Sequence, residues 1–581
     1  MNASEQVQTP RVIIDEVETS HERKIGDEEE ARCDNESIDS HTLFAKEVGV
    51  TVDYERQISL MNKAIHEEIG FGMFQVKLII LAGFGWLADN IWFEILSMSL
   101  TLVNKEWNLS SQNTAKWATF SLYVGLLIGS LFWGFFSDII GRRPSWNITL
   151  FISAAFGIAV GGSNNFTTFC VLLGCLGLGL GGNLPVDGAM LIEYIPGPQQ
   201  WILTFLSLFW CLGQLYAALI GWAFITNFHC EDVLSENGAP CPRADNWGWR
   251  YSWFLLGGSV MVMWIIRFFV YPIPESPKFL LGIGREEQAY EVILYIAKEN
   301  KRTTSLTFEQ LKNAKYGRIE KINNDNTERR SEEVAKKEPE ASVEVREPLR
   351  INRLGNWSDS LWVPGQFRQS WKKVKIAPIA ALFASRKMAL NTILISLCWG
   401  LIGLGYPLYN SFIATYLKDI GNTSDGTSSL SEQYQQLVVF AVCAIPGSFI
   451  AAGTVELKYI GRRLTMAFFT CLTGLFLFLF TTARSSAAVW GWNCATSLTE
   501  NAMYAVLYAI TYEVFPAPQR GTGDGFAMSV QRTFGIVSTL VAIYTPDGQF
   551  KPPIYVSAST FIVASFIMIF LPYEPRGKVA I

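Results

Sequence analysis

Three ionisable side chains lie deep within long apolar runs of the sequence, where an isolated charge is costly: Asp89, Glu500 and Arg532. Ionisable groups inside membrane helices are rare and usually mark a pathway for ions or solutes. Asp89 has no obvious partner, which favours proton or cation handling over a structural role. Glu500 and Arg532 have opposite charges at similar depth and are expected to pair, either structurally or at a binding site. Asp187 and Glu94 lie nearer the ends of their runs, where we expect water to hydrate them.

Aromatic and amide side chains accompany these charges in the first, seventh and tenth apolar runs. Such groups can line a cavity for an organic solute by stacking and hydrogen bonding, although aromatic side chains in membrane helices more often pack against neighbours. Together with Glu500 and Arg532, the predicted cavity residues are Trp86, Asn90, Tyr406, Tyr409, Asn410, Asn501 and Tyr504.

A second set of charges follows the second apolar run, in a motif that contains Gly134, Asp138, Gly141, Arg142 and Arg143. An acid at a helix end, a turn glycine and paired arginines can form charged hydrogen bonds that hold one face of the protein closed. The alternative is a simple positive anchor, which explains the arginines but not the spacing of the acid and the glycines. We therefore predict an ionic latch.

Carboxylates at the ends of the fourth and tenth runs indicate a second latch of the same kind. Glu513 is followed by Arg520, whereas Glu193 has no equivalent arginine and must use one from elsewhere in the chain. The predicted inner-gate residues are completed by Glu275, after the sixth run, and by the pair Arg462 and Arg463.

These residues require membrane helices to position them. Half of the 581 residues are apolar and only 17% are charged, compared with roughly a quarter in soluble domains. A helix that crosses the hydrocarbon core needs about 20 apolar residues, and twelve runs are long enough. The twelve predicted spans are 77–100, 115–136, 146–162, 168–194, 201–226, 250–273, 388–416, 434–455, 464–482, 487–514, 522–545 and 554–572.

Composition also excludes several classes of protein. A soluble enzyme, a nucleic-acid binder and a disordered scaffold are poor interpretations of so apolar a chain with a net charge of −5. No nucleophile–base set, metal-ligand spacing or cofactor motif appears, so we expect neither catalysis nor a bound metal or cofactor.

The two halves of the sequence resemble each other at one fixed offset of 320 residues. The segment 81–90 resembles 401–410, Gly141-Arg142-Arg143 recurs as Gly461-Arg462-Arg463, and Glu193 recurs as Glu513. Parallel repeats of this kind place a binding site between the halves near the middle of the bilayer. We predict an all-α membrane protein with twelve transmembrane helices in two six-helix parallel repeats. The predicted parts are a disordered cytosolic tail at 1–75, bundles at 76–273 and 388–573, a cytosolic linker loop at 274–387 and a C-terminal tail at 574–581.

The short motifs together resemble the sugar-porter branch of the major facilitator superfamily. They read GFFSDIIGRR at 134–143, EYIP at 193–196, PESPK at 274–278, EVFPAPQRG at 513–521 and PYEPRG at 572–577. The segment GFGWLADNIW at 83–92 is more similar to synaptic-vesicle-protein-2-related and fungal organic-solute members. The resemblance implies the major facilitator fold and a transport function. One departure is Leu173, which stands where sugar porters usually carry the arginine that partners the proton-coupling acid of the first span.

Several features orient the predicted spans. The arginine pairs lie on the same side as both termini, which indicates that this side is cytosolic. Cys230 and Cys241 then share one outer loop, where a disulfide can persist. The sequons at Asn108, Asn165 and Asn422 also fall in outer loops, where glycosylation can occur.

The sequence therefore predicts a secondary active transporter of a small organic solute that works by alternating access, with Asp89 as the group coupled to protons. Its expected partners are the lipid bilayer, a small solute and protons, without nucleic acid, and we expect a functional monomer. The plasma membrane is the expected location, with the endoplasmic reticulum or vacuole as the alternative. The alternative function is a non-transporting receptor or sensor that keeps the transporter fold.

Overall fold

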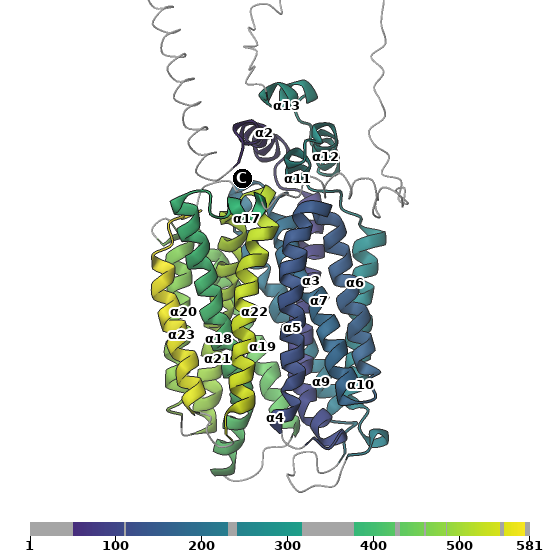
Figure 1. Ribbon diagram of the computed structural model, residues 1–581, viewed down its shortest axis with the longest axis vertical. Helices are drawn as coiled ribbons and strands as arrows, with labels where there is room; N and C mark the ends of the chain where they lie inside the picture. Colours follow the sequence, from purple (N-terminus) through teal and green to yellow (C-terminus); the bar gives the residue numbers. More distant parts are fainter. Residues whose placement is uncertain are drawn as a thin grey trace, which may run out of the picture.

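The computed structural model describes residues 50–109, 112–230, 241–315, 377–423, 430–457, 460–483, 485–546 and 551–575. Every regular element in these residues is a helix. Figure 1 shows two bundles of long helices lying side by side, with a group of short helices over one end. We call the short helices the cap, that end of the molecule the cap side and the other end the distal side.

The first bundle is built from the first half of the chain. Successive long helices cross the bundle in opposite directions. They are α3 (Met73–Glu106), α5 (Trp117–Ile140), α6 (Arg142–Gly161), α7 (Phe166–Ile192), α9 (Ser207–Ile225), which is preceded by α8 (Ile202–Phe205), and α10 (Gly248–Ile265).

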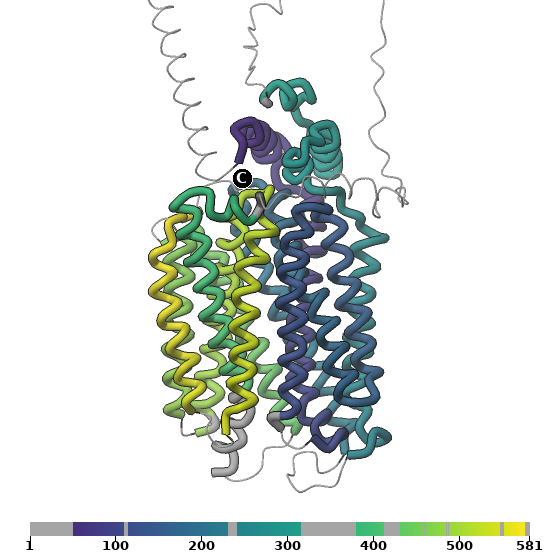
Figure 2. The backbone as a smooth tube through the Cα atoms, in the orientation of Figure 1, coloured from purple at the N-terminus to yellow at the C-terminus, as the bar shows by residue number. Residues whose placement is uncertain are grey.

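The second bundle repeats this plan and meets the first along α5 with α22 and along α9 with α19. Its helices are α18 (Arg386–Thr423), α19 (Leu430–Thr454), α20 (Gly461–Phe480), α21 (Ser486–Val514), α22 (Arg520–Tyr544) and α23 (Lys551–Ile569). The two bundles occupy separate parts of the chain and separate sides of the molecule in the tube view of Figure 2.

Eleven helices among the described residues are long and apolar enough to cross a membrane. The remaining predicted span is α21, whose 29 residues extend roughly 44 Å at about 1.5 Å per residue. It is more polar because it carries Asn493, Glu500 and Asn501, and it packs against α19 and α20 inside the second bundle. The predicted all-α membrane fold is confirmed.

The cap corrects one expectation from the sequence. Residues 1–75 were expected to be disordered, but 52–63 form α2 (Val52–Lys63), followed by a π-helical turn, η1 (Ala64–Ile69). Tyr54, Ile58 and Met61 recur at helical spacing and are buried, so α2 has an apolar face that charge counting over the whole tail conceals. Residues 1–49 lie outside the described part.

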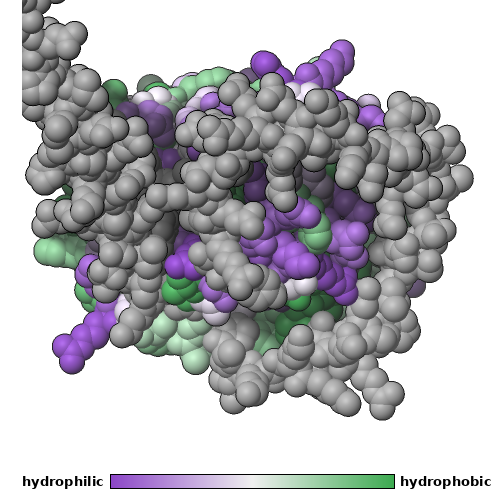
Figure 3. All heavy atoms as spheres, turned by 90° about the horizontal axis from the view of Figure 1, so that it is seen from above, coloured by the Kyte–Doolittle hydropathy of each residue, from purple (hydrophilic) through white to green (hydrophobic). Residues whose placement is uncertain are grey.

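The linker between the bundles supplies the rest of the cap through α11 (Pro277–Gly282), α12 (Glu286–Glu299) and α13 (Phe308–Lys315). The hydroxyl of Tyr54 donates to the backbone oxygen of Lys278 at 3.3 Å, and the amide of Gln57 donates to that of Leu311 at 3.0 Å. Glu68 accepts hydrogen bonds from Thr304 and from the backbone of Ser305, each at 2.6 Å. Figure 3, seen from above the cap, shows a group of hydrophilic residues near the middle of this face, with hydrophobic residues below it.

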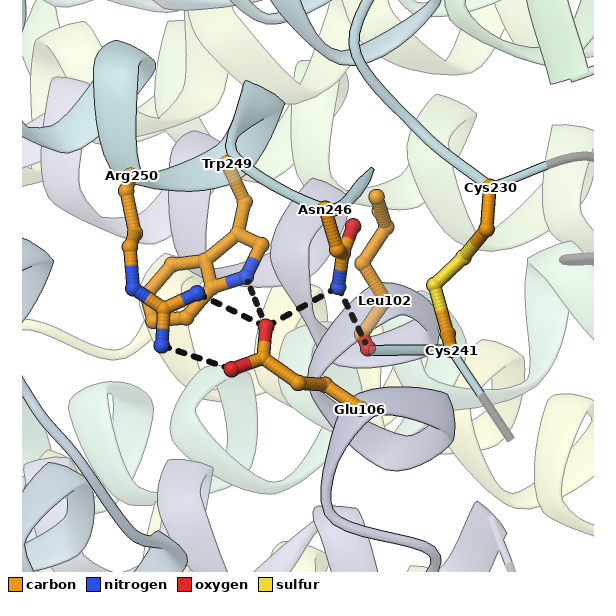
Figure 4. Close-up of a disulfide and its surroundings, with 7 residues drawn as sticks. All are labelled: Leu102, Glu106, Cys230, Cys241, Asn246, Trp249 and Arg250. Carbon is orange, nitrogen blue, oxygen red and sulfur yellow. Dashed lines mark hydrogen bonds and ion pairs between the residues drawn. A yellow bond between two sulfur atoms is a disulfide. The ribbon is translucent and has the colours of Figure 1, made fainter. Parts of the chain in front are cut away.

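On the distal side, a buried ion pair ties α3 to α10. Both oxygens of Glu106 lie 2.7 Å from guanidinium nitrogens of Arg250, and one of them also accepts from Asn246 and Trp249, each at 3.0 Å. A disulfide joins Cys230 to Cys241 next to this cluster (Figure 4). The cluster holds together the distal ends of two helices and the loop between α9 and α10.

We expect the Glu106→Ala substitution to destabilise the protein by about 3–5 kcal/mol, because it leaves the guanidinium of Arg250 buried without a counter-charge. Thermal unfolding of the purified protein in detergent measures the effect as a lower melting temperature. The control is Glu299→Ala, which removes the partly exposed Lys77–Glu299 pair and should cost no more than about 1 kcal/mol. Equal effects of the two substitutions would contradict this assignment.

Candidate functional site: a cavity between the bundles and the gate beneath it

A cavity of about 290 Å³ lies between the two bundles. Residues from α3, α5 and α9 line it on one side, and residues from α18, α19, α21 and α22 line it on the other. Seven of the nine predicted cavity residues are in its wall: Asn90, Tyr406, Tyr409, Asn410, Glu500, Asn501 and Tyr504.

The cavity extends toward the distal side. Its wall runs along α3 from Asn90, at mid-helix, to Asn104 in the last turn, and it includes Lys116 at the start of α5. On the cap side of Asn90, α3 carries Trp86, which is 1% exposed and packs edge-on against Tyr508 at 4.8 Å between ring centroids. Trp86 therefore lies on the cap side of the cavity, behind the residues that form its floor.

Asp89 is completely buried and lies outside the cavity wall. One carboxylate oxygen accepts a hydrogen bond from the amide of Asn183 on α7 at 3.0 Å, and the other has no hydrogen-bond partner among the described residues. The charges that act on Asp89 are those of Arg532, Asp187 and Arg267. A buried carboxylate with one unpaired oxygen can hold or release a proton with little rearrangement of its neighbours.

The expected Glu500–Arg532 ion pair does not form between these two described residues. Glu500 lines the large cavity, whereas Arg532 lines a smaller pocket below it together with Phe93, Tyr123 and Gln531. The guanidinium of Arg532 lies 5.7 Å from the centroid of the Phe93 ring. Similar depth in the bilayer was the basis of the expectation, and depth alone does not fix the face of a helix on which a side chain lies.

Two further expectations need correction. Asp187 is fully buried and forms a 3.1 Å ion pair with Arg267. Glu94 is 8% exposed and lines the cavity, and the amide of Gln214 donates to it at 3.3 Å. Glu94 lies one helical turn beyond Asn90, and this spacing was the signal in the sequence that Glu94 shares the cavity face of α3.

On its cap side, the cavity is closed by contacts between the two bundles. We call this contact region, formed by Asp138, Arg142, Glu193 and Arg520 with the first turn of α22, the gate. Asp138, at the end of α5, accepts hydrogen bonds from the backbone of Gly521 at 3.2 Å and from the backbone and hydroxyl of Thr522 at 2.7 and 2.6 Å. It also forms an ion pair with Arg142, whose guanidinium donates to the backbone oxygen of Ala517 at 2.6 Å. The first turn of α22 is thus held by a carboxylate from the other bundle.

Glu193, at the end of α7, lies between two arginines. One of its oxygens is 3.3 Å from Arg142 and 3.2 Å from Arg520, which belongs to the other bundle. The side chains of all three are completely buried. A buried carboxylate shared by two cations is stable only while both remain in place, so opening of the cap side must break this cluster.

Glu275 positions the start of α6. Its carboxylate accepts hydrogen bonds from the backbone amides of Arg142 and Arg143 at 3.0 and 3.3 Å, and Gly141 provides the turn with φ +112°. Glu574 does the same for the second bundle, where it accepts from the backbone amides of Arg462 and Arg463 at 3.0 and 3.1 Å. The two repeats therefore share one way of ending a helix and starting the next.

Among the described residues, the arginine motif of the second repeat pairs within its own bundle. Arg462 pairs with Glu513 at 2.6 Å and with Glu456 at 3.6 Å, and all three belong to the second bundle. The equivalent of Asp138 is Lys458, which lies outside the described residues. Asp138 of the first repeat bonds to the other bundle, and the second repeat has a lysine in place of this acid.

Lys278 in the cap lies close to the gate charges. Burial and the nearby charge of Arg520 lower its pKa to about 7, which the charge of Glu193 partly opposes. Burial raises the pKa of Glu275. Lys278 is thus partly neutral near pH 7, which limits the repulsion among the cations gathered at the gate.

Two of the three predicted sequons lie on exposed residues of the distal side. Asn108 follows α3, and Asn165 caps the start of α7, where its side chain accepts from the backbone of Thr168 at 2.7 Å. Asn422 falls near the end of α18, in a stretch whose side chains are outside the described part.

Comparison with known proteins identifies the family. The family model for the Major Facilitator Superfamily matches residues 78–454. This chain belongs to the Major Facilitator Superfamily. It is an integral, multi-pass membrane transporter, as the matching family and the membrane-spanning helices together show.

Two facilitator relatives match over most of their length. The chain is 40% identical over 528 residues to a protein of Ceriporiopsis subvermispora named MFS siderochrome iron transporter 1, which covers 91% of this chain and 92% of the relative. It is 34% identical to the major facilitator-type transporter hxnZ of Emericella nidulans, over 91% of this chain and 89% of the relative.

A solved facilitator has the same fold. The proton:xylose symporter XylE, bound to 6-bromo-6-deoxy-D-glucose, matches with a TM-score of 0.60 at 16% identity, over 87% of this chain and 97% of the symporter. At this level of identity the similarity establishes the fold.

The tight crossing of α5 and α22 provides a test of the gate. A Cβ atom at Gly134 would lie 2.7 Å from the Cα of Gly525 and 2.8 Å from the backbone oxygen of Gly521. We expect Gly134→Val to prevent closure of the cap side. A cysteine at Ser97, in the cavity wall, should then react at least several-fold more slowly with a membrane-impermeant thiol reagent applied from the distal side.

The matched control is Gly258→Val on α10, where an added Cβ has no atom within 4 Å. Its labelling rate should equal that of the parent protein. Unchanged labelling in Gly134→Val would contradict the closing role of this crossing.

Proposed function

We propose that the protein is a proton-coupled secondary transporter of a small organic solute that works by alternating access. The observation that carries this proposal is the asymmetry of the space between the bundles. A polar and aromatic cavity reaches toward the distal side, while a buried charge cluster contributed by both bundles seals the cap side. This is the geometry expected of an outward-facing state.

Asp89 is the proposed proton-coupling group. It lies under the cavity on the helix that also carries the cavity residues Asn90 and Glu94, and one of its oxygens is unpaired. The arginine that sugar porters usually supply is replaced by Leu173, and the nearby positive charges come instead from Arg267 and from Arg532 of the other bundle. Protonation of Asp89 would remove its attraction to Arg532 and loosen one link between the bundles.

The second state, with the cap side open, requires the gate contacts to break. Opening the cap side requires Asp138 to release the start of α22 and Glu193 to release Arg520. These charges then become hydrated as water enters, which reduces the cost of separating them. Closing of the distal side would compensate by burying the cavity walls around the solute.

The solute is small because the cavity measures about 290 Å³, at the lower end of the range for small-molecule sites. The name of the 40% identical relative suggests an iron–siderochrome complex, which is larger than this cavity and would require it to widen. It belongs among the probes in a transport assay.

We propose that the cap side faces the cytosol. The arginine pairs at 142–143 and 462–463 lie there, as the positive-inside rule favours. The disulfide and the exposed sequon asparagines Asn108 and Asn165 lie on the distal side, which suits an oxidising and glycosylated compartment. The plasma membrane is the proposed location.

The test uses proteoliposomes with an imposed gradient of one pH unit. The labelled probes are choline, xylose, nicotinate and an iron-loaded siderochrome, and whichever gives saturable uptake is carried forward. Coupling to one proton permits up to about tenfold accumulation. We expect Asp89→Asn to abolish accumulation against the gradient but to retain exchange of labelled for unlabelled solute.

The control for this test is Asp245→Asn on the exposed distal loop, which should accumulate the solute as the parent does. Full accumulation by Asp89→Asn would refute the assignment of Asp89. Absence of saturable uptake for every probe by the parent protein would count against the transport proposal.

A further inference from the structure

The cavity contains one carboxylate from each bundle, Glu94 on α3 and Glu500 on α21. Each has a buried oxygen, Oε1, with no hydrogen-bond partner among the described residues. Glu94 is more than nine-tenths buried. Neither carboxylate forms an ion pair in the described part of the chain, and the one polar neighbour that donates to Glu94 is the neutral amide of Gln214.

The nearby cations are engaged elsewhere. Lys116, at the mouth of the cavity, donates to the backbone oxygen of Ala542 at 3.0 Å. Arg532 lies in the smaller pocket below, against the ring of Phe93, and its charge acts on Asp89. The acidic groups of the cavity are therefore left without a protein cation, and a buried carboxylate in that condition is costly unless something else compensates it.

Aromatic rings surround the same space. Tyr406 is within electrostatic reach of both Glu94 and Glu500, and its ring lies 5.8 Å from that of Tyr504 in an edge-on arrangement. Tyr409 and Phe93 also line the cavity. Aromatic faces attract cations, most strongly where water is excluded, so rings and carboxylates here favour the same kind of ligand.

We propose that the solute carries a positively charged head, an alkylammonium or a heteroaromatic cation, that binds between Glu94 and Glu500 against the tyrosine rings. This inference rests on the proposed transport function and specifies the chemical class of its solute. Because the two carboxylates belong to different bundles, the bound cation attracts both at once. Binding would therefore draw the distal parts of α3 and α21 together, the movement that closes the cavity.

The test is equilibrium binding to the purified full chain in lipid nanodiscs, without any gradient. The probes are two matched pairs, choline with its neutral isostere 3,3-dimethylbutan-1-ol, and N-methylnicotinamide cation with neutral nicotinamide. We expect each cation to bind at least tenfold more tightly than its neutral partner. Glu94→Gln and Glu500→Gln should each weaken binding of the cation at least tenfold and leave binding of the neutral partner unchanged.

The matched control is Glu67→Gln, an exposed glutamate of the cap, which should bind all four probes as the parent does. If Glu94→Gln does not fold, as judged by its melting curve and elution profile, Glu94→Asp replaces it. That variant keeps the charge on a shorter side chain and should retain the preference for the cation at reduced affinity.

Two outcomes would overturn the inference: equal binding of the cation and its neutral isostere, or cation binding that survives in both glutamine variants. Cation binding without uptake in proteoliposomes would support the inference while the transport proposal fails. Saturable uptake that does not depend on solute charge would support the transport proposal and contradict this inference.

Discussion

The closed cap side depends on one constraint: a buried carboxylate must keep all of its cationic partners, and here those partners belong to different bundles. Glu193 shares one oxygen between Arg142 of its own bundle and Arg520 of the other. Asp138 likewise binds Arg142 and the first turn of α22. A partial separation would leave charges buried and unpaired, so the cluster favours two end states, fully closed or open and hydrated.

The same helices connect this gate to the cavity. Helix α22 begins with the gate residues Arg520 and Thr522 and continues to Arg532 in the pocket beneath the cavity. Helix α3 carries Asp89 beneath the floor and Glu94 in the wall. A change of charge near the floor therefore acts on elements that also form the gate, and rigid helices transmit the movement over this distance. The cap adds a further layer, because α11 packs against the segment that precedes α22.

The sequence predicted what depends on periodicity and repetition. Twelve apolar runs and the repeat offset of 320 residues were enough for the fold, and the glycine and arginine motif at 134–143 was enough to predict a latch. The sequence could not show that Glu500 and Arg532 line different pockets, because this depends on how α21 and α22 are rotated about their own axes. Glu94 was assigned to a hydrated helix end because depth was counted along the chain, whereas its surroundings are set by α9, which packs against α3 and places Gln214 beside it. The helical face of α2 was missed among the charges of the tail that surrounds it.

The central claim is that the two ends of the space between the bundles open in alternation. Double electron–electron resonance tests it directly, with spin labels at Tyr251 and Tyr555 on the distal side and at Tyr271 and Leu457 on the cap side, in a variant whose native free cysteines are replaced. All four positions are exposed. Acidification with a bound solute should shorten the distal distance and lengthen the cap-side distance in the same fraction of molecules. Distances that stay fixed, or that lengthen together, would contradict alternating access.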